Sequence, residues 1–256
     1  MTARVALVMG GGAGTGRATV LAFGRAGYTV AIADINEEGG KKSLAELKAG
    51  GADGFFQRAD MASVDDIEAI IGRIRDEYGA LHAVSNNAAM GTKNLPFTEI
   101  SEQAWDRCMD VTLKGVWLSM KQQLPLIEAS GGGAIVNVAS VAGMRGDPFQ
   151  SAYAAAKAGV INLSKTAATE YAKRGVRVNT VCPGGVNSGG MDFYLQQMPA
   201  EMRDKVLNTH AMGRLAEPEE IADAVVYLCG ERASFITGHD LVVDGGILVR
   251  ANVQDI

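Results

Sequence analysis

The sequence predicts a single α/β domain in which helices cover both faces of a doubly wound parallel sheet of about seven strands. Short apolar runs rich in Val, Ile and Ala alternate with longer segments of helical period. Several of these runs are apolar without a break, as expected for strands buried on both faces of a parallel sheet. A glycine-rich turn directly follows the first run, where a strand would pass into a helix.

The predicted elements follow one another in a regular order along the chain. The strands are 5–9, 28–33, a third that ends at Asp60, 81–85, 134–139 and 176–181. Gly27 ends the first helix, Ser101 precedes a long fourth helix, and Glu217-Pro218-Glu219-Glu220 opens the last. No linker, charge block or low-complexity segment interrupts the alternation, so we expect residues 1–256 to form one domain.

Composition and charge narrow the class of protein. With 256 residues, of which 47% are hydrophobic and 21% charged, the chain can bury one large core. A formal net charge of −5 and a pI near 5.3, with Lys and Arg scattered, argue against nucleic acid as a partner. No apolar run approaches the roughly 18 residues of a membrane span, and the N-terminus lacks the pattern of a secretion signal. We therefore expect a cytoplasmic protein without membrane contacts.

The cysteines and histidines do not predict a metal centre. Cys108, Cys182 and Cys229 are odd in number and far apart, which favours buried reduced thiols over disulfides. The three histidines have no ligand-like spacing to one another or to a cysteine. We expect no bound metal.

The turn after the first strand has the spacing Gly10-x-x-x-Gly14-x-Gly16, with Thr15 between the last two glycines. The free N–H groups and the dipole of a helix's first turn attract phosphate, and glycine lets the backbone approach closely. The spacing differs from the G-x-G-x-x-G fingerprint of most dinucleotide folds. The position of the turn, between a strand and a helix, predicts a phosphate site.

Asp34 ends the second strand, eighteen residues after Gly16, where the adenosine ribose of a bound dinucleotide is expected. Its carboxylate would accept hydrogen bonds from the ribose hydroxyls and repel a 2′-phosphate. Neither residues 11–13 nor the neighbours of Asp34 include an Arg or Lys, so NAD is favoured over NADP. The alternative for Asp34 is a helix N-cap. Asp60 is expected to reach the adenine amino group, with capping again as the alternative.

Three polar side chains form a candidate catalytic set. Tyr153 and Lys157 are four residues apart in a helical segment, so their side chains emerge from one face. Taken alone, such a pair is usually a surface contact. Ser140, thirteen residues before the tyrosine, closes the strand 134–139 at the carboxyl edge, where open α/β sheets bind ligands.

The chemistry of this set fits alcohol oxidation. A free tyrosine has a pKa of about 10, and both the Lys157 ammonium and the positive nicotinamide ring of NAD would lower that pKa. Tyr153 would then take the alcohol proton while a hydride leaves the same carbon, or return it in the reverse direction. The Ser140 hydroxyl would hold the substrate oxygen, and Lys157 would also hold the nicotinamide ribose.

Together these motifs resemble the short-chain dehydrogenase/reductase family, from Val5 to about Gly246. The shared motifs are Gly10 with Gly14 and Gly16, Asn86-Asn87-Ala88, Ser140 with Tyr153 and Lys157, and Pro183-Gly184. The resemblance implies a Rossmann-like fold, an NAD-preferring alcohol dehydrogenase or ketoreductase, a final strand at Val243-Asp244-Gly245-Gly246 and a homotetramer. Besides the glycines and the two aspartates, the expected NAD contacts are Thr15, Met61, Asn87, Tyr153, Lys157, Pro183, Gly184, Val186 and Ser188.

One departure from the family pattern bears on mechanism. Members usually have Asn in the segment matched by Val111-Thr112-Leu113-Lys114-Gly115, where it holds a water that links the lysine to solvent. Here the residue is Thr112, which is shorter and β-branched, so we expect an altered proton relay. Replacing it with Asn should leave NAD binding unchanged and keep or raise kcat.

The residues expected to face the substrate are mostly apolar. They are Ser140, Met144, Gln150, Tyr153, Gly185 and Met191, with Phe149 nearby. Segment 188–212, rich in Met, predicts a lid over the ligand, with a surface helical hairpin as the alternative. The substrate is therefore expected to be a small, largely apolar secondary alcohol or ketone.

Two other functions remain open at this point. The first is a 3-oxoacyl-thioester reductase of fatty-acid synthesis, which resembles this family but usually takes NADPH, so Asp34 argues against it. The second is a cofactor-binding scaffold with little turnover, motivated by Thr112. The intact set of Ser140, Tyr153 and Lys157 argues against a scaffold.

Overall fold

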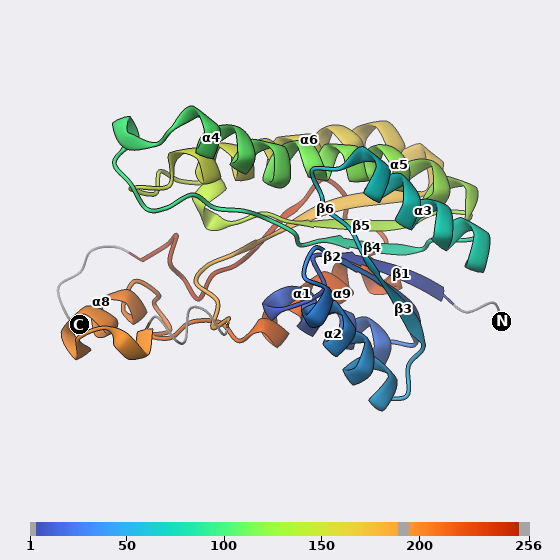
Figure 1. Cartoon of the computed structure of the whole chain (residues 1–256), viewed down its shortest axis with the longest axis horizontal. Coiled ribbons are helices and arrows are strands. Elements are labelled where there is room, and N and C mark those ends of the chain that lie inside the picture. Colours follow the sequence, from blue (N-terminus) through green and yellow to red (C-terminus); the bar gives the residue numbers. More distant parts are fainter. Residues whose placement is uncertain (1–3, 189–194, 251–256) are drawn as a thin grey trace.

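The computed structural model describes residues 4–188 and 195–250, and Figure 1 shows a sheet with helices packed on both of its faces. Seven parallel strands lie in the order β3-β2-β1-β4-β5-β6-β7. The strands are β1 (Arg4–Met9), β2 (Tyr28–Asp34), β3 (Gly54–Arg58), β4 (Ala83–Asn86), β5 (Gly133–Val138), β6 (Val176–Pro183) and β7 (Asp240–Val243). The predicted single-domain, doubly wound sheet is confirmed.

Helices connect the strands and form the two outer layers. They are α1 (Gly14–Arg25), α2 (Glu37–Ala49), α3 (Val64–Tyr78), α4 (Glu102–Met109), α5 (Gly115–Ala129), α6 (Ser151–Tyr171), α8 (Ala200–Leu207) and α9 (Pro218–Cys229). In Figure 1, α3, α4, α5 and α6 lie on one side of the sheet, and α1, α2 and α9 on the other. Short helical turns occur at η1 (Phe97–Glu99), η3 (Val141–Gly143), η4 (Ala172–Arg174) and η5 (Glu231–Ala233).

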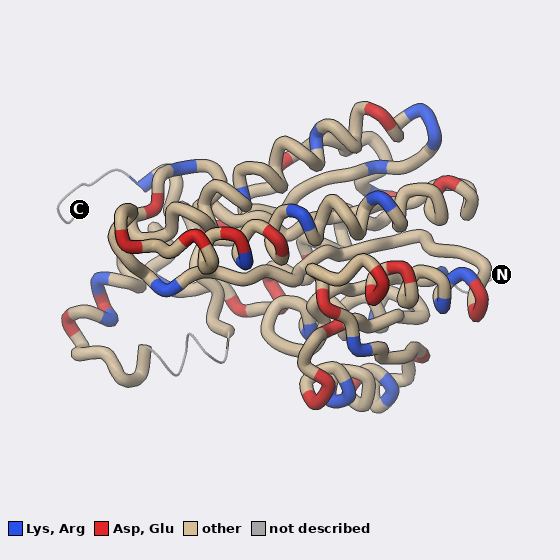
Figure 2. Tube along the Cα trace, turned by 45° about the horizontal axis from the view of Figure 1, so that its top comes forward, with Lys and Arg blue, Asp and Glu red and all other residues tan. Residues whose placement is uncertain are grey.

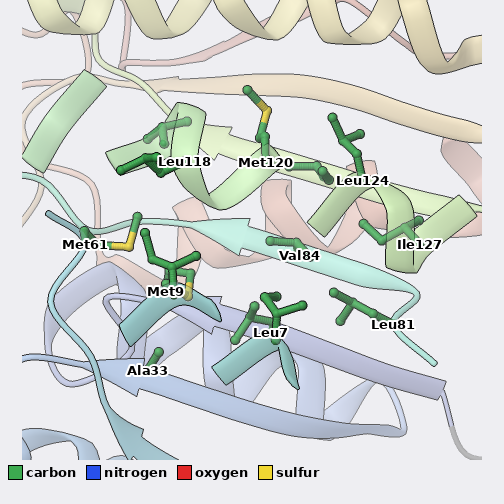
Figure 3. Packing of buried hydrophobic residues seen from close by; sticks show 14 of the residues in the cluster. Leu7, Met9, Ala33, Met61, Leu81, Val84, Leu118, Met120, Leu124 and Ile127 are labelled. Atoms are coloured by element: carbon green, nitrogen blue, oxygen red, sulfur yellow. The ribbon is translucent and has the colours of Figure 1, made fainter. Parts of the chain in front are cut away.

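Unbroken apolar strands supply two cores, one on each face of the sheet. Alternate residues of β1 point to opposite sides: Leu7 and Met9 join the core under α3 and α5, while Val8 joins the core under α1 and α9. Figure 3 shows the first of these cores, in which Leu118 and Met120 of α5 approach the sheet. Both faces are therefore covered, as the apolar runs predicted.

The strand order determines where a ligand can bind. β1 pairs with β2 on one side and β4 on the other, so the connections that leave these central strands run in opposite directions. Loops that diverge in this way leave a crevice at the carboxyl ends of the strands. The glycine turn after β1 and the segment Asn86-Asn87-Ala88 after β4 both lie at this crevice.

Helix boundaries follow the predicted signals, with one interruption. The side chain of Ser101 caps α4, and Glu217 and Glu220 form a capping box at the start of α9. The predicted long fourth helix is α4 and α5 joined by η2 (Asp110–Lys114), a π-helical segment. Such segments occur frequently at functional sites, and this one contains Thr112.

The final strand lies earlier in the chain than predicted. β7 covers Asp240–Val243, whereas residues 243–246 were the expected strand. Gly245 and Gly246 have φ angles of 58° and 84°, which no strand adopts. The Asp244 carboxylate also accepts the N–H groups of Gly246 and Leu248, so the chain turns there.

The surface carries charges of both signs. Figure 2 shows Lys and Arg interspersed with Asp and Glu along the chain. Among residues 4–188 and 195–250, no helix is both long enough and apolar enough to span a membrane.

The segment that follows β6 is only partly described. Ser188 and Leu195 onward are described, whereas the predicted substrate contact Met191 lies outside the described residues. α8 has no buried residue and projects from the body of the molecule in Figure 1. The lid assigned to residues 188–212 stays a prediction.

Candidate active site

Most of the predicted site residues gather in two adjoining cavities at the carboxyl ends of the strands. The larger, of about 580 Å³, is lined by Gly10, Ala13, Thr15, Gly16, Asn87, Ala89, Gly91, Thr92, Asn94, Val138, Ala139, Ser140, Gln150, Tyr153, Lys157, Pro183, Gly184, Gly185, Val186 and Ser188. The smaller, of about 250 Å³, contains Asp34, Asp60 and Met61. Gly10, Ala13, Asn87 and Ala89 line both cavities, so the two form a continuous cleft.

The glycine turn brings the N-terminus of α1 to this cleft. A Cβ atom on Gly16 would lie 1.8 Å from the Gly10 carbonyl oxygen, so only glycine permits the helix to start so close to β1. The N-cap residue, Ala13, has no side chain that could accept the first N–H groups of α1. Gly14, at φ 49°, lies against Ser188 from the loop after β6. The helix end therefore presents backbone N–H groups toward a ligand, as phosphate binding requires.

Asp34 lies beside the glycine turn and is fixed there by backbone groups. One carboxylate oxygen accepts the Gly12 N–H at 2.7 Å and the other accepts the Asn36 N–H at 2.8 Å. The cap of α2 is Asn36, which accepts the Gly39 N–H, so the capping alternative for Asp34 is wrong. A carboxylate has about four acceptor sites, and those left over can serve ribose hydroxyls.

Asp60 lies in the smaller cavity and has two partners that the sequence did not indicate. Its carboxylate accepts the Ala62 N–H at 2.9 Å and a hydrogen bond from the Arg107 guanidinium of α4 at 3.1 Å. Burial raises the pKa of Asp60, but the Ala62 N–H and Arg107 outweigh burial and hold this pKa below its ordinary value. The side chain that caps α3 is Ser63.

Asn87 provides a test of whether a dinucleotide fits. Its amide N–H donates to the Ser85 hydroxyl at 2.7 Å, which leaves the amide oxygen buried without a partner among the described residues. A buried acceptor without a donor is costly, and a ligand in the cleft would supply one. The uncapped N-terminus of α1, the Asp34 carboxylate and the Asn87 oxygen thus form a set that fits a nicotinamide dinucleotide.

Ser140, Tyr153 and Lys157 converge in the larger cavity, as predicted. Ser140 follows β5, and its hydroxyl accepts the Ala142 N–H at 3.1 Å. Tyr153 and Lys157 come from the first two turns of α6, with the Lys157 Nζ 5.6 Å from the centroid of the Tyr153 ring. Lys157 is 2% exposed, and its ammonium donates to the Val138 carbonyl at 2.5 Å.

The chain alone holds Tyr153 in its neutral form. Burial raises the pKa of Tyr153, and the hydrogen bond with Ser140 opposes this rise. Burial also lowers the pKa of Lys157 to about 8, although Cys182 and Cys108 oppose this shift. The lowered tyrosine pKa that the sequence predicted for the complex with NAD is therefore not found in the chain alone, where desolvation outweighs the Ser140 hydrogen bond.

The structure pairs Thr112 with the loop after β4. Its hydroxyl donates to the Met90 carbonyl and accepts the Met90 N–H, both at 2.9 Å. Thr112 is fully buried and lines neither cavity. Its side chain fastens the loop after β4 to η2. The part of Thr112 in a proton relay stays a prediction.

The predicted substrate contacts divide into three groups. Gln150 and Gly185 line the larger cavity, Met144 is 42% exposed and does not line it, and Met191 lies outside the described residues. Phe149 has φ 67°, an uncommon conformation for an aromatic residue, directly before the N-cap of α6.

Sequence reasoning missed Thr92 and Asn94 as cavity residues. Both lie in the loop that follows β4, whose carboxyl end faces the crevice. That position was the available signal, because loops at this edge carry most ligand contacts in open α/β sheets. Beyond Ala88 the loop has no motif of its own.

No cluster of three or more metal-ligating side chains occurs within residues 4–188 and 195–250. Cys108, Cys182 and Cys229 are free and buried. Burial raises the pKa of Cys229 to about 12, against the charge of Arg177, as expected for an inert thiol.

Comparisons with known proteins agree with this geometry. The sequence model described as "Enoyl-(Acyl carrier protein) reductase" matches residues 10–248. A cyclohexanol dehydrogenase of Acinetobacter sp. (strain SE19) is 40% identical over 94% of both chains. A 2,5-dichloro-2,5-cyclohexadiene-1,4-diol dehydrogenase of Sphingobium indicum is 38% identical over 96% of this chain and 97% of the relative.

Among solved structures, levodione reductase superposes with a TM-score of 0.91 at 30% identity, covering 95% of this chain and 96% of the other. The cleft, the catalytic set and these relatives together define an oxidoreductase built on a Rossmann-like sheet. The chain belongs to the short-chain dehydrogenase/reductase family.

The buried Lys157 predicts a specific pH dependence of stability. Its pKa falls from 10.5 to about 8 in the folded chain, so between these values the unfolded chain binds a proton that the native chain lacks. The free energy of unfolding should therefore rise with pH in this window, by up to about 3 kcal/mol. Urea unfolding at pH 7 and pH 9.5 should show that the stability of the parent relative to Lys157→Met increases at the higher pH.

Lys157→Met should also lower the rate of alcohol oxidation by about 10²-fold or more.

Lys48→Met is the control, because it removes a lysine that is exposed on α2. A difference between the parent and Lys157→Met that is equal at both pH values would contradict the burial of a charged ammonium.

Thr112→Val should destabilise the fold, because valine has the same shape but cannot pair with Met90. The Met90 carbonyl keeps a hydrogen bond from the Cys108 thiol at 3.0 Å, whereas the Met90 N–H loses its acceptor. Losing this part-buried hydrogen bond should cost about 0.5–1.5 kcal/mol in the free energy of unfolding. Thr112→Ser, which keeps the hydroxyl, should lose less. Equal stability of the two variants by denaturant unfolding would exclude this structural role.

Proposed function

We propose that this chain is an NAD-dependent dehydrogenase that exchanges a hydride with small, uncharged, cyclic secondary alcohols and the corresponding ketones. One observation carries the proposal: Ser140, Tyr153 and Lys157 line a single cavity that continues into a cleft bounded by the Asp34 carboxylate. When bound, the nicotinamide ring accepts the hydride in oxidation and donates it in reduction.

The chain's own residues handle the proton and orient the substrate. In oxidation, Tyr153 takes the proton of the alcohol oxygen at its Oη while the hydride leaves the carbon. The Ser140 hydroxyl donates a hydrogen bond to the substrate oxygen. The Lys157 ammonium favours the phenolate of Tyr153 electrostatically. In reduction the proton moves back from Tyr153 to the carbonyl oxygen.

The surroundings of Asp34 support NAD over NADP. The carboxylate approaches the glycine turn so closely that a Cβ on Gly12 would lie 2.8 Å from the Asp34 Cγ. The fold also brings one cation to this turn, which sequence adjacency did not reveal: Arg17 donates to the Gly12 carbonyl at 2.5 Å. Arg17 also hydrogen-bonds the Ser43 hydroxyl and lies 4.0 Å from the Glu46 carboxylate, so its guanidinium is already engaged.

The lining of the larger cavity supports an uncharged substrate. Lys157 is its one charged residue among the described ones, and that ammonium is bonded to Val138. Thr92, Asn94 and Gln150 supply neutral polar groups around the catalytic set. A free carboxylate on the substrate would find no available cation there. The names of the cyclohexanol and cyclohexadiene-diol dehydrogenases support a six-membered ring.

A reductase of acyl thioesters is the second candidate, because the matching family description names an acyl carrier protein. Asp34 argues against it, since such enzymes usually take NADPH. A scaffold without turnover would have no use for a lysine whose burial disfavours its charged form.

We further propose that the chain works as a cytoplasmic homotetramer. An apolar surface lies on α5 and α6, where Trp117 is 46% exposed beside Leu113 and Leu163. Exposed apolar patches of this kind usually mark contacts between proteins.

Cofactor titration tests the NAD assignment. NADH should bind at least about tenfold more tightly than NADPH, followed by nicotinamide fluorescence, because Asp34 repels a 2′-phosphate. Asp34→Ala should bring the two affinities closer together, because NADH should bind more weakly and NADPH more tightly. Glu128→Ala, which removes a carboxylate paired with Arg174 away from the cleft, should leave the ratio unchanged. NADPH binding as tight as NADH binding in the parent would refute the preference.

A substrate panel tests the proposed reaction. With NAD, cyclohexanol should give a higher kcat/KM than a cyclohexanol bearing a 4-carboxylate, and added salt should not change their ratio. Tyr153→Phe should lose turnover with both alcohols. Faster reduction of an acetoacetyl thioester with NADPH would establish the second candidate instead, and no turnover of any compound would establish the scaffold.

The mass in solution tests the oligomer. Sedimentation equilibrium should give about four times the 26.8 kDa of one chain, and Trp117→Glu should lower this mass by adding charge to the apolar surface. A monomer in the parent protein would overturn the assembly.

A further inference from the structure

His210 is a buried polar residue that the catalytic scheme does not use. It follows α8 and is 3% exposed, although the residues on either side of it are exposed. Its ring packs against the two glycines after Pro183: a Cβ on either Gly184 or Gly185 would lie 3.1 Å from the His210 Nε2. Both glycines line the larger cavity.

The hydrogen bonds of His210 define its protonation state. The Gly185 N–H donates to Nε2 at 2.9 Å, so Nε2 carries no proton. On the other side, Nδ1 lies 3.2 Å from the Thr209 hydroxyl, which uses its single proton to bond the Val206 carbonyl at 2.7 Å. The Thr209 oxygen must therefore accept from Nδ1–H, and His210 is the neutral Nδ1–H tautomer.

This bond is one of three that hold the backbone of Gly184 and Gly185 in the cavity wall. The Gly185 carbonyl accepts the Ala216 N–H at 2.9 Å, and the Gly184 N–H donates to the Val243 carbonyl at 3.1 Å. His210 thus supplies the acceptor of the Gly185 N–H. Without an acceptor at Nε2, this part-buried N–H would be unpaired and the wall would shift.

We propose that neutral His210 is a positioning residue for the substrate end of the site, which holds the loop 183–188 in place through Gly185. The proposal rests on the function proposed above for the same cavity. Protonation of Nε2 would bring its N–H against the N–H of Gly185, so this hydrogen bond would be lost and the loop released. Substrate affinity should then fall in acid while the proton-transfer chemistry at Tyr153 is untouched.

Burial favours the neutral form of the His210 ring against most of its neighbours. Burial lowers the pKa of His210 most strongly, while backbone hydrogen bonds with Leu207 and Val206 raise this pKa. Arg145 makes the smallest contribution, which lowers it. The Asp244 carboxylate raises this pKa, but its oxygens also accept the N–H groups of Gly246 and Leu248. Arg250 contacts the backbone carbonyl of His210 at 3.2 Å. The loop should therefore stay in place down to below the ordinary histidine pKa of about 6.5.

Two substitutions distinguish the loss of the hydrogen-bond acceptor at Nε2 from the loss of the imidazole ring. His210→Gln places an amide oxygen near the position of Nε2 and does not titrate, whereas His210→Met has similar length and no comparable acceptor. KM and kcat for the alcohol are measured from pH 5 to 8. The KM of the parent should rise toward low pH, the KM of His210→Gln should stay flat, and the KM of His210→Met should be about tenfold higher throughout.

His82→Asn is the matched control. His82 also accepts a backbone N–H, that of Val5 at 3.1 Å, and burial also lowers the pKa of His82. It lies just before β4, at the amino ends of the strands and so away from the cleft. Its variant should keep the acid rise in KM. A rise that persists in His210→Gln, or a His210→Met variant with the KM of the parent, would overturn the proposal.

A measurement without substrate separates this inference from the proposed function. Two-bond ¹⁵N–¹H spectra of ¹⁵N-histidine protein report each ring's tautomer, and the signal missing in His210→Gln identifies His210. The Nδ1–H tautomer at pH 7 is expected even if no alcohol is turned over. An Nε2–H tautomer or a charged ring would overturn the positioning role by itself.

Discussion

The close approach of α1 to the end of β1 is the constraint on which the rest of the site depends. Because a Cβ on Gly16 would collide with the Gly10 carbonyl, any other residue would push the helix away from the sheet. The helix end would then no longer face the crevice between β1 and β4. Asp34 depends on the same turn, since it is held by the Gly12 N–H, so the phosphate end and the ribose end of the cleft are set together.

The electrostatics of the catalytic set follow from its burial. Desolvation raises the pKa of Tyr153 and lowers that of Lys157, and both shifts oppose an ionised pair in the chain alone. The Val138 carbonyl compensates part of the cost of the buried ammonium. The protein thus positions Tyr153 and Lys157, although burying the Lys157 ammonium lowers the stability of the fold. Such a cost in stability is typical of functional sites.

Three segments far apart in the sequence close the walls of the cavity. The loop after β4 is fastened to η2 by Thr112, the loop after β6 is fastened by His210 and Ala216, and the turn before α6 carries the strained Phe149. In the first two segments a backbone group of the wall is paired with a side chain or peptide from another element. Substrate selectivity therefore depends on hydrogen bonds behind the wall as well as on the residues that face the ligand.

The sequence by itself determined the sheet, the glycine turn, Asp34 and the set of Ser140, Tyr153 and Lys157. These are signalled locally, because apolar periodicity, glycine at a strand–helix turn and a four-residue helical spacing are properties of neighbouring residues. Only the tertiary structure decided the partners across the sheet: Arg107 on Asp60, Arg17 at Gly12, Met90 on Thr112 and His210 on Gly185. The family resemblance also misplaced the last strand, since the Asp244 turn that ends it could be seen only in the folded backbone. Contacts between residues distant in the chain depend on the packing of whole elements, and no motif of a few residues encodes them.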